Sequence, residues 1–306
     1  MNAEKTIKIG YLCKTKGYEF HKNALEGTLA AAKDANIDIV YQVVGTDAAE
    51  IRKAYDAFVA RGCNVIIDFS CSGETGRQIA RLCEQKGILD ISVDSDNTEY
   101  GCTTYFFGLD NHDAGKVLGE GAYQWLSYNG LADKVDHIIQ LNASSIGEAV
   151  WDRTDDAVDI MCEKTGLSRT DNCEDIDATS IDLAYVRQKV QDCLSACRDY
   201  EQIVFFCLTS SWTPAVVAAV SAAGLDDRVA YFSVNGISET INTFREANKG
   251  VDTILKGEVA TSPELYGGKI IDLVRKLMAG ETCDRYNYST NNWMTKDNVD
   301  ELYPET

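Results

Sequence analysis

The chain has 306 residues, about twice the length of a typical domain, which predicts two domains. Its 48 acidic and 29 basic side chains give a net charge of −19, which argues against nucleic acids and anionic membranes as partners. No apolar run approaches the roughly 20 residues of a membrane helix, and residues 1–6 lack the apolar stretch of a signal peptide. We therefore expect either a cytosolic protein or an exported one whose signal has been removed.

Six apolar runs, each typical of a buried strand, are followed by a polar residue and then by a helix-like stretch. The runs cover residues 7–12, 64–69, 89–93, 136–141, 203–208 and 229–234, and the polar residues after them are Lys14, Ser70, Asp94, Asn142, Thr209 and Asn235. In an open parallel sheet, ligands bind beyond the carboxyl ends of the strands. Each residue alone could instead cap the following helix, but six such ends together favour a polar ligand site.

Helical periodicity fills the stretches between these runs. In the first half it predicts helices over 21–35, 47–60 and 74–86, with a further strand over 37–43. In the second half it predicts helices over 111–127, 147–164, 183–197, 213–223, 238–246 and 264–279, with a strand over 251–255. Strands that alternate with helices of this length are typical of parallel sheets. The predicted fold class is therefore α/β, with two similar lobes that are each a parallel sheet flanked by helices.

Sequence motifs for catalysis are missing from the chain. There is no GxGxxG or GxxxxGK[ST] loop for nucleotides and no GxSxG turn for hydrolysis. Of the three histidines, His21 is a candidate ligand contact, His137 is expected to be structural, and His112 is expected to cap a helix or face solvent. These features predict a protein without enzymatic activity, cofactor or metal.

Eleven cysteines are many for a chain of this length, and their odd number leaves at least one thiol free or paired with another chain. The sequence contains no CxxC and no cysteine–histidine cluster with zinc spacing. Cys162 and Cys173 flank a predicted turn and could form a disulfide. The cysteine content as a whole favours a reducing setting.

Four segments resemble a known family. Residues 9–27 (IGYLCKTKGYEFHKNALEG) look like its first strand, aromatic loop and helix, and residues 91–96 (ISVDSD) look like its third-strand motif. Residues 107–115 (FGLDNHDAG) match its crossing segment, and residues 293–299 (WMTKDNV) match its C-terminal end. Over nearly its whole length, the chain resembles the type I periplasmic sugar-binding proteins of ABC transporters, close to the ribose-binding proteins.

The resemblance implies three hinge crossings between an N-terminal lobe of residues 1–110 plus 262–290 and a C-terminal lobe of residues 111–261 plus 291–306. The ligand contacts that it implies are Lys14, Tyr18, Phe20, His21, Asp94 and Ser95 in the first lobe, and Arg153, Thr209 (or Ser210), Asn235 and Thr261 in the second. Trp151 and Trp212 would offer further flat surfaces to a sugar, although each could equally be a packing residue. Ser95 and Asn235 stand where ribose binders have arginine and aspartate, which argues against ribose itself.

The implied function is the capture of a monosaccharide or related polyol in the interlobe cleft and its delivery to an ABC transporter permease. Such a protein would be a monomer in the periplasm, or lipid-anchored at the cell surface, with its export signal removed. Two alternatives stay open: a ligand-sensing module for a membrane signalling kinase, and a cytosolic sugar-processing enzyme.

Overall fold

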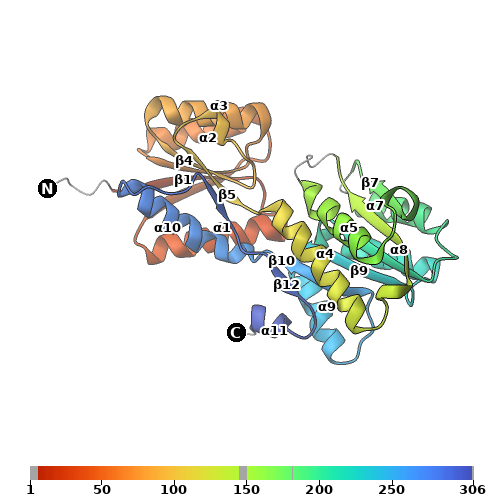
Figure 1. Cartoon of the computed structure of the whole chain (residues 1–306). Coiled ribbons are helices and arrows are strands. Elements are labelled where there is room, and N and C mark those ends of the chain that lie inside the picture. Colours follow the sequence, from red (N-terminus) through yellow and green to blue (C-terminus); the bar gives the residue numbers. More distant parts are fainter. Residues whose placement is uncertain (1–5, 145–149, 181, 305–306) are drawn as a thin grey trace. The chain divides into compact units, whose positions relative to one another are not determined.

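The computed structural model of the chain describes residues 6–144, 150–180 and 182–304. The chain divides into two compact units, each made of two sequence segments (Figure 1). The first unit contains Met1–Leu109 and Ser262–Thr290, and the second contains Asp110–Thr261 and Asn291–Thr306, so the chain passes between the units three times. In the described ranges, no helix combines the length and the apolar character needed to cross a membrane.

The first unit is built on a parallel sheet. Its described residues form six strands in the order β11-β5-β4-β3-β1-β2. The strands are β1 (Lys8–Cys13), β2 (Asp38–Val43), β3 (Val65–Phe69), β4 (Leu89–Val93), β5 (Thr104–Gly108) and β11 (Tyr286–Tyr288). The helices are α1 (Glu19–Asp34), α2 (Ala48–Ala60), α3 (Gly73–Lys86) and α10 (Tyr266–Met278), with the short 3-10 helices η1 (Thr98–Tyr100) and η5 (Pro263–Leu265).

Alternating side chains give this sheet two buried faces. Tyr11 of β1 and Ile67 of β3 pack in one apolar cluster with α1 and α10. Leu12 and Ile66, each one residue away along the same strands, pack in a second cluster with α2 and α3. Because helices cover both faces, only the strand ends of the sheet can present polar groups to a ligand.

Helices α1 and α10 approach each other closely at two glycines. A Cβ on Gly267 of α10 would overlap the backbone of Gly27 and Thr28 in α1. The same contact brings Tyr266 edge-on against Phe20 in the first turn of α1, with ring centroids 5.6 Å apart. The packing of the two helices therefore fixes the residues that follow β1.

The second unit is built on a mainly parallel sheet. Its described residues form six strands in the order β12-β10-β9-β8-β6-β7, and only the β10–β12 pair is antiparallel. The strands are β6 (Val135–Asn142), β7 (Cys173–Asp177), β8 (Gln202–Cys207), β9 (Val229–Asn235), β10 (Leu255–Ala260) and β12 (Asn292–Met294). The helices are α4 (Asn111–Tyr128), α5 (Asp152–Thr165), α6 (Arg169–Asn172), α7 (Leu183–Leu194), α8 (Thr213–Ala223), α9 (Ser238–Asn248) and α11 (Val299–Leu302), with the 3-10 helices η2 (Ala132–Lys134) and η4 (Ser210–Trp212).

Helices cover both faces of this sheet as well. Phe205 of β8 lies in an apolar cluster with α7 and α8, and Phe232 of β9 packs on the other face against Trp125 of α4, with ring centroids 6.1 Å apart. Helices α4 and α5 pack closely because α4 carries Gly115, where a Cβ would overlap the backbone of Asp152. This contact fixes the start of α5, where a predicted ligand residue lies.

The predicted fold is confirmed: each unit contains a largely parallel sheet flanked by helices. Several predicted elements are wrong in detail. The strand predicted over 251–255 is Leu255–Ala260, because the hydroxyl of Thr253 accepts the N–H of Leu255 (3.1 Å) and forms a turn. The helix predicted over 183–197 ends at Leu194, and the one predicted from residue 147 is described only from Asp152, since residues 145–149 lie outside the described residues. The sequence pattern does not predict the short strands β5, β7, β11 and β12.

Two adjacent glycines of α10 allow a matched test of this packing. Gly267→Ala should lower the free energy of unfolding by about 1–3 kcal/mol, because its methyl group would force α1 and α10 apart. Gly268→Ala meets nothing within 4 Å and should raise it by about 0.5–1 kcal/mol through helix propensity. Urea denaturation of both variants measures the difference, and equal stabilities would contradict the close contact.

Candidate functional site

The predicted contacts of the first loop lie around the start of α1. Lys14 follows β1 and is exposed, and Tyr18 precedes α1 with 48% of its surface exposed. Phe20 and His21 belong to the first turn of α1, which begins at Glu19 rather than at the predicted residue 21. The helix therefore holds both side chains in fixed directions instead of leaving them on a loop.

These side chains form an aromatic cluster, defined here as Tyr18, Phe20, His21 and Phe69. The imidazole ring of His21 stacks on Phe69 at the end of β3, with centroids 4.8 Å apart and planes inclined by 27°. Phe20 meets Phe69 edge-on at 6.1 Å, and Tyr18 lies 6.2 Å from His21. Phe69 carries no signal of this role in the sequence, where it reads as an ordinary buried strand residue. Flat apolar rings beside polar groups suit the C–H faces of a polyhydroxylated ligand.

His21 is a neutral imidazole at ordinary pH. Burial, helped by the positive charge of Lys14, lowers its pKa to about 4. Its Nδ1 atom is buried and has no hydrogen-bond partner among the described residues. A neutral imidazole has one N–H donor and one acceptor nitrogen, so His21 can exchange a hydrogen bond with a hydroxyl group without adding charge.

Asp94 leaves β4 in a backbone conformation that is rare for residues with a side chain. Its φ angle is +56°, and its N–H donates to the carbonyl of Phe107 (3.0 Å). The carboxylate accepts the N–H of Leu109 (3.2 Å), and the absence of a side chain at Gly108 leaves room for it. Such conformations cost free energy and gather at functional sites, which favours a ligand-directed role for Asp94.

The neighbours of Asp94 have separate roles. Ser95 is half-buried, and its carbonyl accepts the hydroxyl of Ser92. Asp96 accepts both the N–H (2.9 Å) and the hydroxyl (2.7 Å) of Thr98, so its carboxylate caps η1. The two carboxylates, although only two residues apart, are therefore not an acid–base pair.

A buried carboxyl group braces the turn after β3. Asp68 accepts the N–H groups of Ser70 (3.2 Å) and Cys71 (2.9 Å), and burial raises its pKa to about 6. The hydroxyl of Ser70 donates to the carbonyl of Gly45 (2.6 Å). Ser70, one of the strand-end residues in the sequence, thus belongs to the support of the site. Asp68 itself carries no sequence signal beyond one acid within an apolar run.

In the second unit, three predicted residues form one connected network at the ends of β8, β9 and β10. The side-chain amide of Asn235 donates to the hydroxyl of Thr209 (2.9 Å). The carbonyl of Asn235 accepts both the N–H (3.2 Å) and the hydroxyl (3.0 Å) of Thr261. The structure therefore brings Thr209, Asn235 and Thr261 together at the carboxyl edge of the sheet. Asn235 has a φ angle of +125°, the second strained strand end.

Arg153 lies in the first turn of α5 and is half-buried. Its Nε atom donates to the amide oxygen of Asn111 at the start of α4 (2.7 Å), and its Nη1 atom lies 3.4 Å from the carbonyl of Leu208, just beyond β8. These contacts hold the guanidinium group at the strand ends of the second unit. Its planar fork of donors suits vicinal hydroxyl or carboxylate oxygens.

Another buried carboxyl group braces the turn after β9. Glu258 of β10 is fully buried, and its Oε1 atom accepts the N–H of Gly236 (2.8 Å). Burial raises its pKa, although the hydrogen bond from the N–H of Gly236 opposes the shift. Glu258 is not among the predicted site residues, because strand β10 is predicted too early in the chain.

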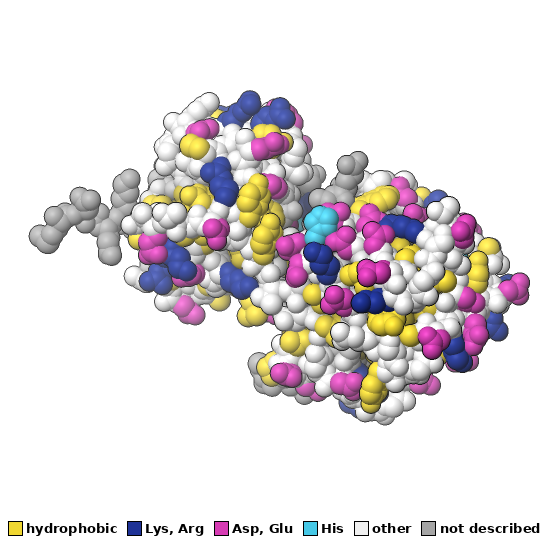
Figure 2. Space-filling view, in the orientation of Figure 1, with side chains coloured by type: hydrophobic (Ala, Val, Ile, Leu, Met, Phe, Trp, Pro, Cys, Tyr) yellow, Lys and Arg dark blue, Asp and Glu magenta, His cyan; other side chains and the backbone are white. Residues whose placement is uncertain are grey.

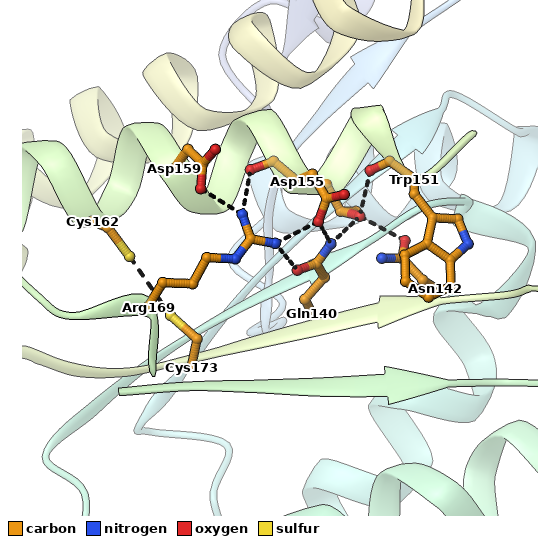
Figure 3. A network of polar contacts seen from close by, with 9 residues as sticks. Gln140, Asn142, Trp151, Asp155, Asp159, Cys162, Arg169 and Cys173 are labelled. Atoms are coloured by element: carbon orange, nitrogen blue, oxygen red, sulfur yellow. Dashed lines mark hydrogen bonds and ion pairs between the residues drawn. The ribbon is translucent and has the colours of Figure 1, made fainter. Parts of the chain in front are cut away.

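The two tryptophans differ in role. Trp212 is 3% exposed and lies within the apolar cluster of α7 and α8, so the interpretation of Trp212 as a sugar-facing surface is wrong. Trp151 is half-buried just before α5, and its indole nitrogen has no hydrogen-bond partner in the described part of the chain. Figure 3 shows Trp151 beside Asn142, the strand-end residue of β6. Asn142 accepts the hydroxyl of Thr154 (2.6 Å) and thus belongs to a structural network.

On the face shown in Figure 2, basic side chains are interspersed with acidic ones and do not gather in one patch. Within the described ranges, no group of three or more histidine, cysteine or acidic side chains is arranged to hold a metal ion. The candidate site therefore consists of hydrogen-bonding and aromatic groups at the strand ends of each unit.

Residues 9–282 match the model of a family described as "Periplasmic binding protein domain". The chain belongs to this family. Its members bind solutes and are not enzymes. A search of curated proteins found no match.

Solved structures share the fold over nearly the whole chain. A solute-binding protein of an ABC transporter from Actinobacillus succinogenes, with bound D-allose, is 16% identical with a TM-score of 0.80, covering 96% of this chain and 99% of that one. One from Agrobacterium vitis, with bound allitol, is 17% identical with a TM-score of 0.77, covering 98% and 99%. A chain of the XylFII–LytSN complex is 15% identical with a TM-score of 0.73, covering 95% and 98%. At these identities the likeness establishes the fold.

The low pKa of His21 predicts a loss of stability in acid. Because its pKa of about 4 lies below the unfolded value of 6.5, the unfolded chain binds a proton first, and the folded state loses stability as pH falls from 6.5 to 4. The loss should be roughly 2–3 kcal/mol relative to His21→Gln, measured as the difference in unfolding free energy across that range. His112→Gln is the control: Asp156 raises the pKa of His112, so its contribution has the opposite sign. Parallel curves for wild type and His21→Gln would contradict a neutral, buried His21.

Proposed function

We propose that the chain is an extracytoplasmic solute-binding protein that captures a monosaccharide or related polyol and delivers it to an ABC transporter permease. The proposal rests on the polar residues at the carboxyl ends of the strands in both units. In a chain of the periplasmic binding protein family, each unit presents the hydrogen-bonding residues expected from the resemblance at the carboxyl edge of its sheet. Structural relatives whose bound ligands are D-allose and allitol support the same ligand class.

The chemistry of these residues fits a ligand with many hydroxyl groups. Asp94 accepts and Arg153 donates charge-assisted hydrogen bonds, which are shorter and stronger than neutral ones. His21 and Asn235 supply neutral groups, and the rings of the aromatic cluster supply apolar surface. Lys14, exposed and close enough to lower the pKa of His21, adds a cation that a ligand carboxylate could use.

We propose further that one ligand contacts both units. Asp94 and Ser95 belong to the first unit, whereas Arg153 and Asn235 belong to the second. A ligand that binds residues of both units stabilises the arrangement in which both sets reach it, and the three chain crossings would serve as hinges. The permease would then recognise the ligand-bound arrangement.

The remaining parts of the proposal concern location and partners. We infer that the protein works as a monomer in the periplasm, or lipid-anchored at the cell surface, without a cofactor. A signalling role is the second candidate, and the likeness to a chain of the XylFII–LytSN complex favours it, since that chain was solved as part of a complex. Both roles use the same ligand site.

A thermal-shift screen against pentoses, hexoses, deoxysugars, polyols and sugar acids tests the ligand class. A ligand at 100 times its dissociation constant should add about 2.7 kcal/mol to the folded state and raise the melting temperature clearly. The ligand should be recovered chemically unchanged after hours of incubation. The absence of a shift across the library would remove the simple sugar or polyol proposal.

With a ligand in hand, Asp94→Asn isolates the charge of the carboxylate, because asparagine tolerates positive φ angles. We expect the binding free energy to become less favourable by about 1.5–3 kcal/mol, which is the contribution of a hydrogen bond to a charged group. Asp96→Asn is the matched control, since Asp96 caps η1 and should leave affinity within about twofold of wild type. Titration calorimetry measures both, and equal affinities for the two variants would rule out Asp94 as a contact.

Small-angle scattering tests the proposed closure. Saturating ligand should decrease the radius of gyration, because a ligand shared by two units favours the more closed arrangement. In Arg153→Ala, the ligand should still bind weakly to the first unit, but the radius of gyration should decrease less than in the wild-type protein. A radius that stays constant at full saturation of the wild-type protein would contradict shared binding.

A further inference from the structure

Two cysteines of the second unit face each other at close range. Cys162 lies in the last turn of α5 and Cys173 is the first residue of β7. Their Sγ atoms are 3.6 Å apart, and both side chains are half-buried (Figure 3). A disulfide needs its two cysteines this close and correctly oriented, and most cysteine pairs in a protein are not. Cys193 and Cys197 of α7 and the turn after it are a second pair of neighbouring thiols, but only Cys162 and Cys173 would join a helix to a strand of the sheet.

The segment between the two cysteines is held in place without a covalent bond. Arg169, within that segment, donates to the carboxylates of Asp155 and Asp159 at 2.5 Å each. It also donates to the side-chain oxygen of Gln140 (3.1 Å), which lies in β6 (Figure 3). Gly166 ends α5 with a φ angle of +77°, so the chain turns back toward the sheet. These contacts keep the two sulfur atoms together in the reduced protein.

We propose that Cys162 and Cys173 form a reversible disulfide that fastens the C-terminal end of α5 to β7. The oxidant is a low-molecular-weight disulfide. One thiolate attacks it and releases one small thiol, and the second cysteine then attacks the mixed disulfide and releases the other. In total, two protein thiols are oxidised to one disulfide, and one small disulfide is reduced to two thiols, so protons and electrons balance.

The surroundings set the conditions for this exchange. Burial and the hydrogen bond to Cys162 raise the pKa of Cys173 to about 12, while the charge of Arg169 acts in the opposite direction. Because the thiolate is the reactive form, attack by Cys173 should be slow at neutral pH and faster in mild alkali. The bond would secure the segment that carries Arg169, and with it the ion pairs that hold Asp155 next to Gln140.

Incubation of the purified full-length chain with glutathione disulfide at pH 8.5 tests the proposal. We expect the thiols of Cys162 and Cys173 to be lost to alkylation under denaturing conditions, with no glutathione attached to either residue. Peptide mapping should identify a cross-link between Cys162 and Cys173. The melting temperature should rise by roughly 5–10 °C, because the bond closes a short loop in the unfolded chain, and dithiothreitol should reverse the change.

Cys162→Ser and Cys173→Ser should each abolish the cross-link and the rise in melting temperature. Cys283→Ser, a half-buried cysteine of the first unit, is the matched control and should keep both. A wild-type protein that stays without the Cys162–Cys173 cross-link after equilibration with the oxidant overturns the proposal. A cross-link that joins Cys193 to Cys197 in its place overturns it as well. Both results come from the wild-type protein and are independent of how well the variants fold.

Discussion

Helices cover both faces of each sheet, and this burial confines polar chemistry to the strand ends. Strands β3 and β8 consist entirely of buried residues, so a ligand cannot reach them from the side. The turns that follow the strands must then satisfy their own backbone N–H groups while they present side chains outward. Each unit solves this with a buried carboxyl group: Asp68 accepts two N–H groups after β3, and Glu258 accepts one after β9. Both turns therefore keep a defined shape at the strand ends, where the candidate ligand residues lie.

Burial of the two carboxyl groups has a cost. Desolvation raises the pKa of both Asp68 and Glu258, and the hydrogen bonds that they accept oppose that shift. A carboxyl group in such a place is retained only where the backbone groups it satisfies would otherwise be left unpaired. Asp68 accepts the N–H of Ser70, and Glu258 accepts the N–H of Gly236. This indicates that a fixed shape of these two turns outweighs the free-energy cost of desolvating the carboxyl groups. A turn of fixed shape is what a ligand site needs, since a loosely held contact loses affinity to conformational entropy.

The sequence carries enough information for the fold and for part of the site. Apolar runs that end in polar residues identify the strand ends, and Thr209, Asn235 and Thr261 do meet in one network. Tertiary neighbours decide the rest. Trp212 and Trp151 look alike in the sequence as aromatic residues at helix starts, yet only Trp212 lies in the core.

The functional residues that were not predicted from the sequence have one physical cause in common, which is that their roles depend on tertiary neighbours. Phe69 becomes part of the aromatic cluster only because α1 starts two residues earlier than its periodicity predicts and brings His21 over the ring. Asp68 stands alone within an apolar run, and Glu258 shares its strand with Lys256, so the sequence pattern does not distinguish a buried carboxyl group from one at the edge of a sheet. Their partners are backbone N–H groups of turns, and backbone partners leave no trace in the amino-acid sequence.

The strained backbone points to the same residues by an independent route. In the described chain, the residues other than glycine with positive φ angles are Asn36, Asp94, Asn235 and Ser262. Asn36 follows the C-terminal end of α1, a place where asparagine often adopts this conformation, and Ser262 is the first residue after a crossing between units. Asp94 and Asn235 have neither explanation, and each lies at the end of a strand in a different unit. Such conformations cost free energy and gather at functional sites, which agrees with the ligand contacts proposed for both residues.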